Sequence, residues 1–113
     1  MPIYEYQGKK PKIGNTSYVH PTAVLIGEVI IGEGCWIGPN VTMRADEGRI
    51  EMGDYSNLQD NAVIHGSKVY LGRYSHLGHG CILHGVTLGE HVLVAIRAVI
   101  LDGAEVGDWC TIA

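Results

Sequence analysis

The chain has 113 residues, of which 46% are hydrophobic, so it is long enough for one packed domain and too apolar to remain disordered. Its formal net charge of -4 and its lack of a large Lys/Arg cluster argue against a nucleic-acid-binding surface, and no apolar run approaches the roughly 20 residues of a membrane span. The N-terminus has no apolar signal-peptide region, and three scattered cysteines do not make a disulfide framework; we therefore expect a cytoplasmic protein.

Residues 1–18 precede the regular part of the sequence. Residues 3–6 alternate in a way that predicts a short strand, and residues 7–10 contain a glycine where a turn is expected. We predict that this segment is an N-terminal cap, because the terminal unit of a solenoid has to cover an open core.

From residue 19 onward, aliphatic residues recur every six positions with three interruptions. The series is Val19, Leu25, Ile31, Ile37 and Met43, then Met52, Leu58 and Ile64, then Leu71 and Leu77, and finally Leu88, Val94, Ile100, Val106 and Ile112. A six-residue period fits neither the face of an α-helix nor the plain alternation of a strand. Hexads that combine a short strand with a corner build a parallel β-helix with triangular coils of about 18 residues. We therefore predict an all-β fold in which residues 19–113 form a hexapeptide-repeat β-helix.

The three interruptions all lie near histidines. Nine residues separate Met43 from Met52, which predicts a bulged loop at residues 46–49, and an extra residue follows Ile64. One residue is missing from the two hexads that end at Leu88. A repeat that is irregular near its polar residues indicates a functional site, because a pure scaffold gains from regularity.

Three histidines are candidate metal ligands. His65 follows the inward residue Ile64 and His84 follows Leu83, one coil plus the extra residue later, so we expect the two to stack on adjacent coils. His79 belongs to another side of the triangle and would join them only from a neighbouring chain, which predicts sites between the subunits of a trimer. Three histidines with an open fourth position are the ligand set of a catalytic zinc site. The alternative is that all three are corner residues bonded to the backbone.

Six polar residues are candidate catalytic residues. They form one group in the first interruption and one just before His65, namely Arg44, Asp46 and Glu47, and Asn57, Gln59 and Asp60. Because Met43 and His65 are just over one coil apart, we expect the two groups to lie side by side.

Each polar side chain has a functional and a structural interpretation. Arg44 would form an ion pair with Asp46 or Asp60. With either partner, the pair would contact substrate or have a purely structural role. Gln59 would orient a metal-bound hydroxide or cap a turn, and Glu47 would carry protons or remain a solvated carboxylate. The remaining histidines, His20, His76 and His91, are expected at corners or in solvent, and Cys81 in the core.

Four segments together closely resemble the γ-class carbonic anhydrases and their bacterial and archaeal relatives: residues 44–48, 57–61, 63–65 and 78–85. The resemblance extends over essentially the whole chain. It implies a left-handed parallel β-helix, a homotrimer and a zinc ion at each subunit interface, with iron or cobalt as possible substitutes. His65, His79 and His84 match the metal ligands of that family.

The same resemblance assigns roles to the six polar residues. Gln59 matches the residue that hydrogen-bonds the metal-bound hydroxide, and Glu47 matches a carboxylate assigned to proton transfer. The other four match an inter-subunit charge network and a further amide of the site: Arg44, Asp46, Asp60 and Asn57. Relatives continue into further coils and a C-terminal helix, so we expect this chain to be shortened at its C-terminus and to lack that helix.

These observations predict zinc-dependent, reversible hydration of CO2 to bicarbonate by metal-bound hydroxide at trimer interfaces. Two alternatives stay open. One is a non-catalytic trimeric scaffold of the same family. The other is a CoA-dependent acyltransferase or thioesterase, which would use a metal-free histidine as its base.

Overall fold

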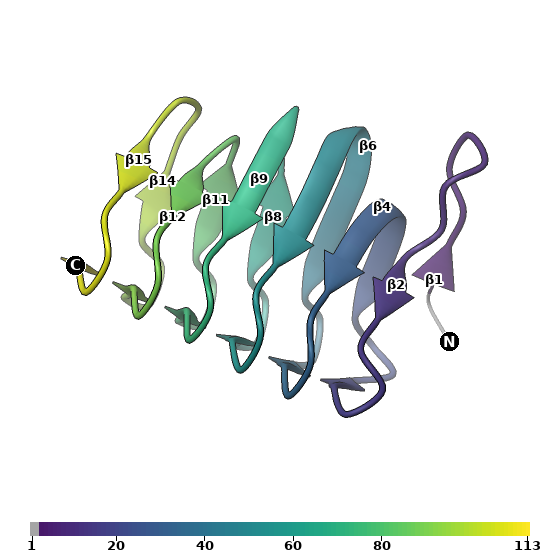
Figure 1. Ribbon diagram of the computed structural model, residues 1–113, viewed down its shortest axis with the longest axis horizontal. Helices are drawn as coiled ribbons and strands as arrows, with labels where there is room; N and C mark the ends of the chain where they lie inside the picture. The colour runs from purple at the N-terminus through teal and green to yellow at the C-terminus, as the bar shows by residue number, and fades with distance from the viewer. Residues whose placement is uncertain (1–2) are drawn as a thin grey trace.

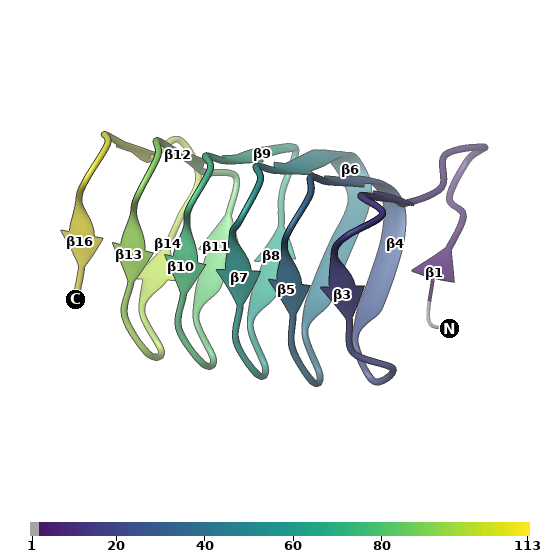
Figure 2. The same ribbon diagram turned by 60° about the horizontal axis from the view of Figure 1, so that its bottom comes forward.

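The computed structural model describes residues 3–113 and shows the parallel β-helix that the hexads predicted, with the left-handed sense that the family resemblance implied (Figure 1). Its coils lie side by side along the longest dimension of a body of 34 × 25 × 21 Å, with the first and last strands at opposite ends (Figure 2). No described segment is a helix long and apolar enough to span a membrane.

The coils stack into a prism with three faces. Face 1 consists of the first halves of β4 (Val24–Ile31) and β6 (Thr42–Met52) with β8 (Val63–His65), β11 (Ile82–His84) and β14 (Val99–Ile100). Face 2 consists of the second halves of β4 and β6 with β9 (Lys68–Leu71), β12 (Thr87–Leu88) and β15 (Glu105–Val106). Face 3 consists of β3 (Tyr18–Val19), β5 (Trp36–Ile37), β7 (Asn57–Leu58), β10 (His76–Leu77), β13 (Leu93–Val94) and β16 (Thr111–Ile112).

The predicted inward residues form the core. On face 1, Leu25 pairs with Met43, and the same register continues through Ile64, Leu83 and Ile100. The first four of these side chains are fully buried. Burial of one such side chain contributes about 1.5–3 kcal/mol, so repeated aliphatic columns stabilise a prism that is too narrow for large aromatic residues.

The N-terminal segment enters the same parallel ladder. Strand β1 (Ile3–Tyr4) and strand β2 (Lys12–Ile13) both pair with β4. Between them, Gln7 and Gly8 adopt positive φ angles of 49° and 79° in a tight turn closed by a bridge between Tyr6 and Lys9. Residues 1–2 of the predicted cap lie outside the described residues.

The first interruption of the repeat is a bulge inside a strand. Gly27 pairs with Ala45 and Val29 pairs with Ile50, so residues 46–49 lie opposite Glu28 alone. The predicted bulge at residues 46–49 is confirmed, but these residues do not form a loop, because they continue strand β6 around the corner between faces 1 and 2. A Cβ atom at Gly48 would overlap the carbonyl oxygen of Ser67, so this close approach of two coils requires glycine.

Candidate metal-binding site

His65 and His84 stack at the same corner of adjacent coils, as the spacing predicted. They are direct partners in the pairing of β8 with β11. Nδ1 of His65 lies 3.1 Å from Nε2 of His84, and the two ring planes are inclined by 73°. The extra residue after Ile64 thus keeps the two histidines in register.

Each of these histidines binds a carboxylate through its other ring nitrogen. Nε2 of His65 lies 2.9 Å from Oδ1 of Asp46, and Nδ1 of His84 lies 2.5 Å from Oδ1 of Asp102. An ionised carboxylate only accepts hydrogen bonds, so each ring donates its N–H to its carboxylate. When both rings are neutral, the nitrogens that face one another both present lone pairs.

Two facing lone pairs repel each other unless a proton or a cation lies between them. Two zinc–nitrogen bonds of about 2.0–2.1 Å at a tetrahedral angle place the nitrogens about 3.3 Å apart, close to the 3.1 Å between His65 and His84. A carboxylate behind each ligating histidine is also the usual surroundings of a protein metal site. The donor set therefore fits a zinc ion.

Arg44 connects to the pair through Asp46. Nη1 of Arg44 donates to Oδ2 of Asp46 over 2.7 Å. The hydrogen bond from Arg44, followed by the one from His65, holds the pKa of Asp46 below its usual range. Asp46 is therefore ionised at neutral pH and fixes the orientation of the His65 ring.

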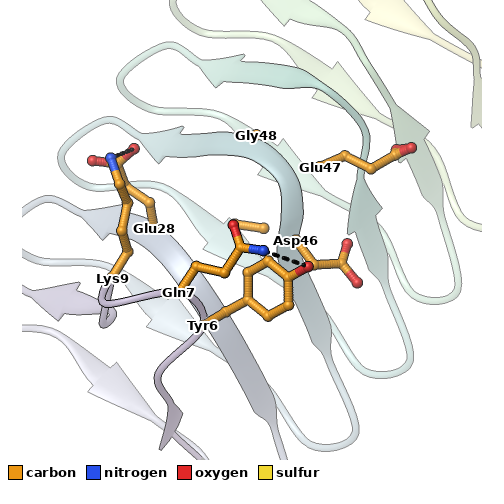
Figure 3. A pocket seen from close by; sticks show the side chains of 8 residues that line it. Tyr6, Gln7, Lys9, Glu28, Asp46, Glu47 and Gly48 are labelled. Carbon is orange, nitrogen blue, oxygen red and sulfur yellow. Dashed lines mark hydrogen bonds and ion pairs between the residues drawn. The ribbon is translucent and has the colours of Figure 1, made fainter.

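Glu47 lies on the same side of the bulge as Asp46. Its Oε1 atom is 3.7 Å from Nε2 of His65. Successive strand residues normally point to opposite faces, but Figure 3 shows both carboxylates pointing the same way, away from Lys9 and Glu28. A hollow of about 200 Å³ separates this bulge from the N-terminal turn that contains Gln7.

His79 does not join the other two histidines within one chain. It lies at the corner between faces 3 and 1, where Nδ1 is 3.5 Å from Oδ1 of Asp60. Among residues 3–113, one cluster has the composition of a metal site, and it consists of Glu47, His65 and His84, whose ligand atoms lie within 4.8 Å of one another. A contribution of His79 from a neighbouring chain remains a prediction.

The expectation that the two polar groups lie side by side was wrong for a single chain. Asn57 belongs to face 3 and Gln59 follows that strand, whereas Arg44 lies on face 1 at the strand end occupied by His65. Asn57 and Gln59 flank the inward Leu58, so their side chains point outward from face 3. The two groups can therefore meet only across a boundary between chains.

Asn57 and Gln59 form a hydrogen-bonded chain with His76. Nε2 of Gln59 donates to Oδ1 of Asn57 over 3.0 Å, and Nδ2 of Asn57 donates to Nδ1 of His76 over 2.6 Å. His76 is exposed to solvent, as expected, and it is also a hydrogen-bond partner of this group. The three side chains, together with His79, line a hollow of about 330 Å³.

Sequence reasoning did not identify Asp102 as a partner of His84, or His76 as a partner of Asn57. Each lies about one coil from its partner, 18 residues after His84 and 19 residues after Asn57 respectively, so coil spacing was the available signal. The expectation for Cys81 was confirmed: it is fully buried, and burial raises the pKa of its thiol to about 11. A thiol that stays protonated is not a metal ligand.

Comparison with known proteins places these features in context. Residues 10–45 match the family described as bacterial transferase hexapeptide (six repeats). The chain is 43% identical to the carnitine operon protein CaiE of Proteus sp. (strain LE138) and 41% identical to CaiE of Escherichia coli (strain K12). Both alignments cover 100% of this chain and 59% of the relative, so the chain spans just over half the length of these curated relatives.

Solved structures share the fold. A hexapeptide transferase family protein from Anaplasma phagocytophilum superposes with a TM-score of 0.84 at 28% identity, over 94% of this chain and 75% of that chain. A putative acetyltransferase from Bacillus cereus gives a TM-score of 0.72 at 24% identity, over 94% and 74% of the two chains. The second likeness concerns the fold alone.

Proposed function

Because the chain is a hexapeptide-repeat protein with a left-handed β-helix fold, we propose that it is a metal-dependent hydratase of the γ-carbonic-anhydrase type, which interconverts CO2 and bicarbonate. The observation that carries this proposal is the pair of facing nitrogens of His65 and His84, 3.1 Å apart, each ring held from behind by a carboxylate.

His65 and His84 would hold the metal ion, with His79 of a neighbouring subunit as the third ligand. Three histidines leave one position open for substrate. A bound zinc ion supplies the Lewis acidity that makes water a nucleophile near neutral pH. The protein's own part is to orient both rings, through Asp46 and Asp102, and to keep the site accessible to CO2.

The surface around the histidine pair supports an assembly through face 1. Its outward residues next to His65 and His84 form a mostly aliphatic column: Val24, Thr42, Val63, Ile82 and Val99. Ile82 and Val99 are 39% and 55% exposed, and a contiguous apolar strip of this kind marks an association surface. Covering it with another chain would bring a second polar group to the pair.

The polar residues then have distinct tasks. Gln59, whose amide is fixed through Asn57 and His76, would hydrogen-bond the reacting oxygen atom from the neighbouring subunit. Glu47 is half-exposed and lies beside His65, so it would carry protons between the site and bulk water. Arg44 holds Asp46 in its ionised form.

Metal analysis and stopped-flow CO2 hydration test this proposal. Protein purified without added zinc should contain about one zinc or iron ion per chain, as a complete three-histidine site requires, and His84→Ala should lose it. Hydration should exceed the buffer rate and should be abolished by His79→Ala. A metal-free chain that still forms trimers would instead support a scaffold role.

A second candidate function is CoA-dependent acyl transfer. The His84–Asp102 pair favours it, because a carboxylate-oriented imidazole is the arrangement of a general base, and a structural relative is described as a hexapeptide transferase family protein. A chelator separates the two candidates. Acyl transfer from acetyl-CoA would survive EDTA and fail in His84→Ala, whereas CO2 hydration would stop with the chelator.

A further inference from the structure

We propose that Glu47 is an additional metal ligand, so that His65, His84 and Glu47 of one chain hold the ion before the subunits assemble. On assembly, His79 of the neighbouring subunit replaces Glu47, which then becomes free to transfer protons. This inference rests on the proposed metal-dependent function and adds a ligand and a loading step to it.

The geometry brings three donors of one chain together. The ligand atoms of Glu47, His65 and His84 lie within 4.8 Å of one another. The present approach of Oε1 of Glu47, 3.7 Å, is to Nε2 of His65, the nitrogen that also binds Asp46. Glu47 therefore has to turn past this edge of the ring to reach the ion between His65 and His84. The Glu47 side chain is 52% exposed, so it can rotate the remaining distance toward the two rings without displacing core residues.

The neighbouring carboxylate is already engaged, which leaves Glu47 as the available one. Asp46 accepts hydrogen bonds from both Arg44 and His65. The only ion pair of Glu47 within residues 3–113 is the one to His65. Two histidines and one glutamate are a known catalytic zinc ligand set, so the single chain has a complete donor set without His79.

The bulge is what makes this arrangement possible. Residues 46–49 lie opposite Glu28 alone, and the carboxylates of Asp46 and Glu47 point the same way (Figure 3). Both approach Nε2 of His65. In a regular strand, Glu47 would point away from Asp46. The extra residues that interrupt the repeat thus supply the third ligand.

Cobalt titration monitored by visible absorbance tests the proposal on four proteins: the natural chain, His79→Ala, Glu47→Gln and the double variant. Each single variant should bind about one cobalt ion per chain, because one third ligand remains, and the double variant should bind more than about 100-fold more weakly, because two histidines alone are not a ligand set. His79→Ala should also show an altered absorption band, since an oxygen donor replaces nitrogen. Glu51→Gln, on the same strand but paired with Arg49, is the matched control and should behave like the natural chain.

The outcomes separate this inference from the proposed function. If His79→Ala binds cobalt as weakly as the double variant, Glu47 is not a ligand, while the inter-subunit site stands. If the double variant binds as tightly as His79→Ala, Glu47 is likewise excluded. If the natural chain, folded by circular dichroism, binds no cobalt, the proposed function fails together with this inference.

Discussion

Replacing Asp102 by asparagine tests the arrangement behind the proposed metal ligands. Oδ1 of Asp102 lies 2.5 Å from Nδ1 of His84. Asparagine keeps the size of the side chain but removes the negative charge that stabilises the proton on Nδ1 of His84. Loss of such a partner typically weakens metal binding by about 10- to 100-fold. The Asp102 side chain is 62% exposed, so water can replace part of the interaction. We therefore expect the dissociation constant for zinc to rise about tenfold, or about 1.4 kcal/mol.

Asp46→Asn provides an internal comparison for this magnitude. The Asp46 side chain is 24% exposed and accepts hydrogen bonds from Arg44 as well as His65. Water replaces the hydrogen bonds of Asp46 less well, so the loss of zinc affinity should approach the upper end of the range, about 100-fold. Isothermal titration calorimetry with zinc at neutral pH measures both variants against Glu105→Gln, an exposed change on face 2.

The ordering of the two variants is the critical result. If both bind zinc within twofold of the natural chain, the carboxylates do not orient the ligating rings. If Asp102→Asn is the more damaging change, exposure does not determine how much each carboxylate contributes. Either result would refute the reasoning from the geometry of the histidine pair.

Three further predictions concern the scaffold. Leu83→Ala should lower the free energy of unfolding by about 2–5 kcal/mol in urea denaturation, because it leaves a cavity in the core, whereas Tyr70→Ala, at an exposed outward position of face 2, should cost much less. Gly48→Ala should reduce both the melting temperature and zinc binding, since its Cβ would overlap the carbonyl oxygen of Ser67; unchanged zinc binding would contradict the role of the bulge. The pKa of Cys81 is raised to about 11 from an ordinary 9.0, so the folded state keeps its proton and stability should fall as the pH rises above 9 toward 11, with a smaller fall in Cys81→Ala.

The repeat made the fold predictable from the sequence. Inward residues such as Leu25 and Met43 recur at a fixed spacing because each coil has to fill the same narrow cross-section. Counting those positions also placed His65 and His84 on adjacent coils, since one inserted residue lengthens one coil without changing the face.

The position of Asn57 and Gln59 could not be predicted in the same way. Counting residues from Met43 gave the coil in which these side chains lie. The face on which they lie depends on where along the coil the bulge at residues 46–49 places its extra residues. Coil counting shows which coils are neighbours. It does not by itself show which corner of the triangle a polar residue occupies.

Contacts between outward side chains were harder still to predict. His76 and Asp102 both lie at ordinary outward or corner positions, and many residues share such positions. Their hydrogen bonds to Asn57 and His84 depend on side-chain rotamers, which a hydrophobic period does not specify. A search for polar residues one coil apart would have identified both as candidates.

Regular and irregular parts of the prism make different contributions to the site. Adjacent coils in a parallel ladder are about 4.7–4.9 Å apart, so a repeated position can place two histidine rings within reach of one ion, as His65 and His84 show. The same regularity keeps further ligands of the column too far along the axis to converge on that ion. A third donor must come from a bulge, which brings Glu47 to His65, or from a second chain. A metal site in a β-helix therefore requires either a break in the repeat or an oligomer. The bulge at residues 46–49 is such a break in this chain.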